Sequence, residues 1–114
     1  GEEEPTHLEA YDMKLHSVVL LTLHTPRERI WGLLMDLAPA GITVCGIDLS
    51  AFEDWLSQVG TDEEMGLSTV FYPLQRVERV AMDERMGNLP SLHDRFQLKT
   101  MKQLVDYVED FGFK

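Results

Sequence analysis

Three apolar stretches follow one another with only short turns between them, and this spacing limits the possible folds of the chain more than any other feature. The stretches cover residues 16–24, 29–37 and 42–49, and they are rich in strand-forming side chains. Connections of four residues suit hairpins, whereas parallel strands need a crossover of a dozen or more residues. The sequence therefore predicts an antiparallel meander and disfavours a parallel sheet of alternating strands and helices.

Two glycines lie in the middle of consecutive stretches. Gly32 falls within the second stretch and Gly46 within the third. A glycine inside a strand usually marks a bend or a close approach of two backbones. Two such positions in neighbouring strands predict a tightly curled sheet, as in a small barrel.

A helix is predicted over residues 50–60. Ser50 can cap the free amides of its first turn, and Glu53 completes a possible capping box. One face carries an apolar stripe at helical spacing. The stripe consists of Phe52, Trp55, Leu56 and Val59, and Gly60 follows as the stop signal.

The second half of the chain predicts two more strands and two short helices. The strands cover residues 68–72 and 77–82, with a single turn between them. Ser91 begins the first helix, whose apolar phase slips at Thr100. Thr100 and Gln103 form a possible capping box for the second helix.

These elements predict an α+β protein, built on a small curled antiparallel five-stranded β-barrel with an inserted helix and C-terminal helices. The expected organisation has three parts. Residues 1–15 form a flexible acidic tail, residues 16–86 form the barrel with the inserted helix 50–60, and residues 87–114 form a C-terminal helical extension.

The motifs of residues 16–82 resemble those of the Sm-like and SH3-type small barrels. A Gly32-Leu33-Leu34 step with Asp36 stands in the bent second strand, and Tyr72-Pro73-Leu74-Gln75-Arg76-Val77 joins the last two strands. The resemblance implies a small barrel and ring-like association through exposed strand edges. It does not imply RNA binding, because Ala38-Pro39-Ala40 and Pro73-Leu74-Gln75 stand where RNA-binding members of the family carry their contact residues.

The charge of the chain restricts its partners. Twenty acidic and 10 basic side chains give a net charge of −10, which disfavours nucleic acid and anionic membrane surfaces. The negative charge is concentrated before residue 67, since residues 67–114 are neutral. No apolar run approaches the length of a membrane span, and the single cysteine fits a reducing compartment, so a cytoplasmic protein is expected. The chain begins with glycine, which leaves its native N-terminus open.

Few residues suggest a catalytic, metal-binding or ligand-binding role. The four histidines have no metal-ligand spacing, and Cys45 lies in an apolar strand as a core residue would. Asp36 and Asp48 end neighbouring strands, and together with His24 they could form a small-molecule site at the mouth of the barrel. We assign no catalytic residue, cofactor or metal ligand, and expect a protein that is not an enzyme.

The function expected from the sequence is a protein–protein interaction or assembly module that forms a homo-oligomer. Five strands leave open edges, and the last helix has more apolar surface than a small barrel needs. Trp31 is a core residue or, if exposed beside Phe71, an interface anchor. The alternative function is single-stranded RNA binding in the Sm-like manner. The candidate interface residues are Trp31, Phe71, Tyr72, Arg76, Val105, Val108 and Phe111.

Overall fold

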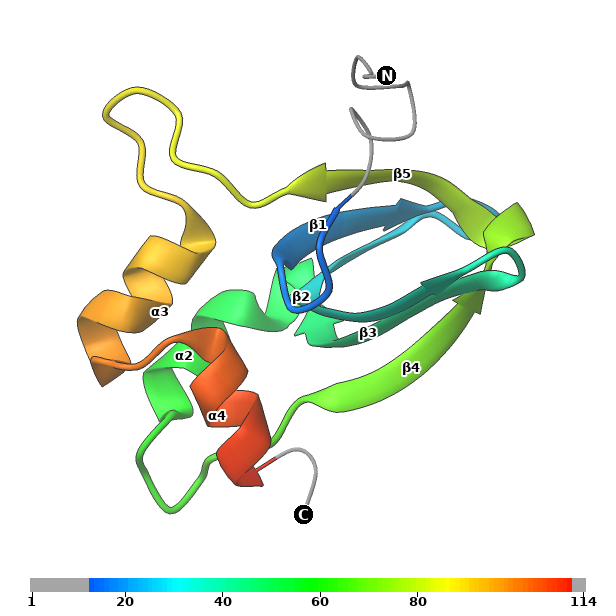
Figure 1. Cartoon of the computed structure of the whole chain (residues 1–114). Coiled ribbons are helices and arrows are strands. Elements are labelled where there is room, and N and C mark those ends of the chain that lie inside the picture. Colours follow the sequence, from blue (N-terminus) through cyan, green and yellow to red (C-terminus); the bar gives the residue numbers. More distant parts are fainter. Residues whose placement is uncertain (1–12, 112–114) are drawn as a thin grey trace.

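Five strands form one antiparallel sheet in the order β4-β3-β2-β1-β5 (Figure 1). The computed structural model describes residues 13–111, so most of the expected acidic tail lies outside the described residues. The predicted α+β class and the antiparallel meander are confirmed. The strands are β1 Val18–Leu23, β2 Glu28–Ala38, β3 Gly41–Asp48, β4 Ser68–Pro73 and β5 Val77–Met82.

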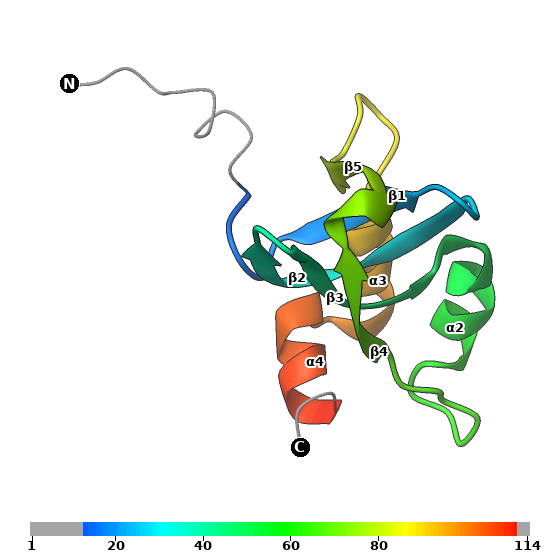
Figure 2. The same ribbon diagram turned by 90° about the vertical axis from the view of Figure 1, so that its right-hand side faces the viewer.

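The sheet bends where the two strand glycines face each other. Gly32 of β2 pairs directly with Gly46 of β3. A Cβ atom on Gly46 would lie 2.1 Å from the carbonyl oxygen of Trp31, and one on Gly32 would lie 2.5 Å from that of Cys45. Only glycine fits such a close backbone approach, which explains both positions and the strong curl of the sheet (Figure 2). No ladder joins β4 to β5 in the described sheet, which is therefore curled but open.

A single 3-10 turn, η2 Leu74–Arg76, connects the two edge strands, as the sequence predicts. The backbone N–H of Leu74 donates to the carbonyl of Ala40 in the β2–β3 turn at 2.9 Å. At the other end of η2, the N–H of His24 in the β1–β2 turn donates to the carbonyl of Arg76 at 3.0 Å. The curl thus brings both hairpin turns to the same short connection.

The two faces of the sheet bury separate apolar clusters. Side chains alternate along β1, so Val19 and Leu21 point to the concave face while Val18 and Leu20 point to the helices. The concave cluster contains Val19, Leu21, Leu23, Ile30, Leu34, Ile42 and Val44. The helix-covered cluster contains Trp31, Leu33, Cys45, Phe52, Trp55, Leu56, Val59, Phe96, Leu104, Tyr107 and Val108. The C-terminal helices therefore pack on their own chain.

The inserted helix begins later than predicted. The 3-10 turn η1 Leu49–Ala51 comes first, and α2 covers Phe52–Gln58. Ser50 lies inside η1, where its N–H and hydroxyl donate to a carboxylate oxygen of Asp48 at 2.9 and 2.7 Å. These hydrogen bonds lower the pKa of Asp48. The expected capping box is therefore wrong: Asp48 caps η1, and Glu53 forms a bidentate ion pair with Arg95, both distances 2.7 Å.

Two short C-terminal helices are confirmed, α3 Leu92–Thr100 and α4 Leu104–Phe111. Ser91 caps α3 through a capping box with Asp94. The predicted capping box at Thr100 is wrong, because Thr100 is the last residue of α3 and α4 begins only at Leu104. The first amide of α4 donates instead to the imidazole of His93.

Candidate functional site at the sheet edges

Strand β4 is the most exposed element of the sheet. It pairs with β3 on one side, and no described strand lies on the other side. Five of its six residues are exposed, including two large apolar side chains. Val70 is 38% exposed and Phe71 is 49% exposed. An edge strand with unpaired backbone groups and exposed apolar side chains is a template for pairing with another chain.

An apolar groove lies beside β4 and is lined by residues from both faces of the sheet. Tyr72 and Val70 pair across from Ile42 and Val44, whose side chains belong to the concave cluster. Side chains of β4 that share this face therefore continue the apolar surface to the edge. The groove has a volume of about 420 Å³, and its apolar lining includes Ile30, Ile47, Met65, Val70 and Tyr72.

Phe71 lies on the opposite face of β4. A Cβ atom placed on Gly41 would lie 2.7 Å from the Phe71 ring, so the ring covers this glycine. The contact fixes one side of the ring against β3 and leaves the other side in solvent. β4 thus presents apolar side chains on both faces.

The other edge, β5, is more polar. Glu78 and Arg79 are exposed, and the Glu78 carboxylate lies 3.7 Å from the guanidinium of Arg27. Arg79 stands across β1 from Arg29, because both pair with the buried Thr22. The two open edges therefore differ in chemistry, one apolar and one charged.

Tyr72 and Arg76 lie together where β4 turns into η2. Partial burial, followed by the negative charge of Glu28, raises the pKa of the Tyr72 hydroxyl. Arg76 lies 3.5 Å from the carboxylate of Glu28 through its Nη2 atom, and its buried Nε atom has no hydrogen-bond partner within the described residues. Of the predicted interface residues, Tyr72 and Arg76 therefore lie together, whereas Phe71 lies on the other face of β4.

Two predicted interface residues require correction because they are buried in the chain. Trp31 is 0% exposed: its indole N–H donates to Asp83 at 2.9 Å, and its ring contacts Phe52 at a centroid distance of 4.9 Å. Val108 is 1% exposed because its face of α4 packs on the sheet. Val105 is half-buried against the same cluster, and the side chain of Phe111 lies outside the described residues.

The hypothetical small-molecule site of Asp36, Asp48 and His24 is not assembled. Asp36 pairs with Thr43, whereas Asp48 pairs with Ile30 at the other end of β2. Six residues of strand separate these positions, a distance of about 20 Å along the chain. His24 lies in the β1–β2 turn, where its Nδ1 atom is 3.1 Å from the hydroxyl of Thr25.

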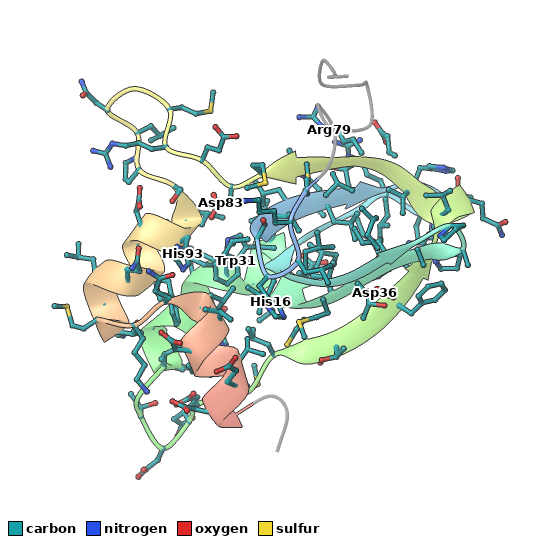
Figure 3. All side chains as sticks on the ribbon, viewed as in Figure 1. His16, Trp31, Asp36, Arg79, Asp83 and His93 are labelled. Carbon is teal, nitrogen blue, oxygen red and sulfur yellow. The ribbon has the colours of Figure 1, made fainter. Side chains whose placement is uncertain are left out.

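A polar junction that the sequence did not reveal joins the sheet to the helices. Trp31, Asp83 and His93 lie close together there, far from Asp36 (Figure 3). The Asp83 carboxylate accepts hydrogen bonds from the Trp31 indole and from the backbone amides of Leu92 and His93, at 2.9, 3.1 and 2.8 Å. Asp83 thereby caps α3 and orients the core tryptophan. An acid shortly before a predicted N-cap is the only sequence signal for this role.

The described residues contain no group of three or more histidine, cysteine or acidic side chains that could hold a metal ion. Cys45 is a buried free thiol, as predicted for a core residue. Within residues 13–111, none of the helices has the length and apolar character needed to cross a membrane.

Comparisons of the chain with protein-family models, with curated proteins and with solved structures find no match.

Proposed function

We propose that this protein is a non-enzymatic assembly module whose copies associate through the edges of their sheets. The observation that carries the proposal is β4, an edge strand with five of six residues exposed and an apolar groove beside it. Pairing of β4 with β5 of a second copy would satisfy the unpaired backbone groups of both edges. The groove along β4 would bury Val70 in the same contact.

The strand arrangement also supports the resemblance to Sm-like and SH3-type barrels. Five antiparallel strands, a bent glycine-containing β2 and a short turn between β4 and β5 match the pattern on which that resemblance depends. Because β4 and β5 are different surfaces, their contact is heterologous, and it generates a ring if the rotation closes. We propose such a ring, with a sheet that continues from copy to copy.

The oligomeric state tests this proposal directly. Size-exclusion chromatography with light scattering, at tens of micromolar chain, is expected to show an oligomer. Phe71→Glu adds a charge at the exposed edge, and it should shift the population toward monomer because this charge must be desolvated on pairing. Leu98→Glu on α3 is the matched control, since Leu98 is 82% exposed and lies away from both edges. A monomeric wild-type protein would refute the assembly proposal.

A second candidate function is single-stranded RNA binding. The observation in its favour is the pair of exposed arginines, Arg29 and Arg79, that flank Thr22 on one face of the sheet. The net charge of −10 opposes it. Filter binding of mixed oligonucleotides at low salt decides between the two functions, since low salt favours contacts driven by charge. Absence of binding there excludes the RNA alternative, and loss of binding in an Arg29→Gln, Arg79→Gln variant would support it.

A further inference from the structure

His93 connects the last two helices through its side chain. It is the second residue of α3, and its Nε2 atom accepts a hydrogen bond from the backbone N–H of Leu104 at 3.0 Å. Leu104 is the first residue of α4, so its amide has no acceptor inside its own helix. The imidazole supplies that acceptor and acts as the cap of α4.

The position of the imidazole is fixed from the other side. The backbone N–H of His93 donates to Asp83, which also holds the indole of Trp31. The ring stacks on Phe96 with a centroid distance of 6.2 Å and an interplanar angle of 20°. The end of β5, the core tryptophan and the start of α3 therefore hold the ring in the geometry that the cap of α4 requires.

The cap depends on the protonation state of the ring. Nε2 can accept a hydrogen bond only in the neutral imidazole with its proton on Nδ1. A second proton would convert Nε2 into a donor, which would then face the N–H of Leu104. We propose that His93 is a pH-sensitive latch that keeps α4 docked when neutral and releases it when protonated.

The groups around His93 set the direction of this response. Burial lowers the pKa of His93 below its ordinary value of 6.5, against the opposing effect of the Asp83 and Asp94 carboxylates. The Asp94 carboxylate also forms an ion pair with Arg85, whose guanidinium nitrogen lies 3.3 Å from a carboxylate oxygen. From α4, the ring meets the amide of Leu104, while the nearby Tyr107 hydroxyl donates to Glu64.

The sign of the pH effect follows from the lowered pKa. The neutral ring contributes its full stabilisation above pH 6.5, the ordinary value of a released histidine. This contribution is lost as the pH falls below 6.5 and through the folded-state pKa of His93. Acidification therefore favours release of α4.

Release would be local, because the two faces of the sheet have separate cores. Leu104, Tyr107 and Val108 attach α4 to the helix-covered cluster, with Tyr107 at centroid distances of 5.8 Å from Trp55 and 5.5 Å from Phe96. None of the α4 side chains that the structure describes belongs to the concave cluster. A released α4 would uncover Trp55 and Phe96 while the strands stay paired.

NMR of the full chain tests the latch between pH 7.5 and 5. Imidazole nitrogen correlations should show the Nδ1–H tautomer for His93 and a midpoint below 6.5. Amide exchange in α4, corrected for intrinsic rates, should show an opening equilibrium that rises by up to about tenfold for each pH unit below 6.5, since opening takes up one proton. Amides of β2 and β3 should keep their protection.

Two variants separate the latch from other effects of pH. His93→Gln places an amide oxygen near the position of Nε2 and does not titrate, so the pH dependence of α4 should disappear. His24→Gln, at an exposed histidine, should leave it intact. Unchanged pH dependence in His93→Gln would overturn the proposal. If that variant fails to fold, the wild-type spectra still decide, because an Nε2–H tautomer or full protection of α4 at pH 5 contradicts the latch.

Discussion

Strands β3 and β4 are neighbours in the same sheet, yet one is buried and the other is exposed. They pair over six residues, from Gly41 opposite Pro73 to Gly46 opposite Ser68. Both have the composition of a strand, but five of the eight residues of β3 are buried and none of β4 is. The comparison shows that composition predicts a strand without predicting its place in the sheet.

The difference arises because, on this side of the sheet, the buried residues of both apolar clusters extend no further than β3. Val44 is buried in the concave cluster, and its partner Val70 is 38% exposed. On the other face, Cys45 is buried under the helices while its partner Thr69 is exposed. One strand spacing of about 5 Å therefore separates the core from the proposed interaction surface.

The largest effect is expected in the central strands. Gly46→Val would place a side chain 2.1 Å from the Trp31 carbonyl, and the backbone of β2 would have to move. We expect a loss of at least about 3 kcal/mol in the free energy of unfolding. Urea denaturation followed by circular dichroism measures it. Gly66→Ala is the control, since nothing lies within 4 Å of its Cβ position, and equal losses in both variants would contradict the close-approach explanation.

An intermediate effect is expected where β5, the second edge, meets the helices. Asp83→Asn keeps the shape of the side chain but removes charge and one acceptor from a site that serves three donors. We expect a loss of about 2 kcal/mol. Asp62→Asn in the exposed loop should change stability little. A stable Asp83→Asn variant would show that Trp31 and α3 do not need this carboxylate.

The smallest effect is expected on β4. Phe71→Ser removes a ring that is half exposed and covers Gly41, so a loss of about 1 kcal/mol is expected in the isolated chain. The same denaturation experiment at low and high chain concentration distinguishes folding from assembly. A loss much larger than 1 kcal/mol at low concentration would place Phe71 in the core and remove the contrast with β3.

Much of the fold could be predicted from local patterns. The strand runs, the bend at the strand glycines and the apolar stripe of the inserted helix each depend on residues close together in the sequence, and the structure confirms them. The expected cap at Ser50 failed because Asp48, two residues earlier, accepts from the Ser50 N–H and hydroxyl and caps the turn that precedes α2. The expected cap at Thr100 failed because the first amide of α4 donates to His93, 11 residues earlier and brought close only by the fold.

The candidate site was predictable only in part, because its formation depends on distant residues. Phe71 and Tyr72 are predicted as interface residues at the end of a strand that Pro73 terminates. Trp31 was uncertain, since a strand tryptophan can face the core or the solvent. Its burial follows from Asp83, 52 residues later, and from helices whose docking no local pattern reveals.

The single cysteine can serve as a probe of how often the core of the protein opens. Cys45 is 0% exposed and lies beside the glycine pair at the centre of the sheet. A thiol-reactive reagent can reach its sulfur only while the packing around it is open. The rate of modification therefore records how often the centre of the protein opens, and it limits how quickly two chains could become linked by a disulfide.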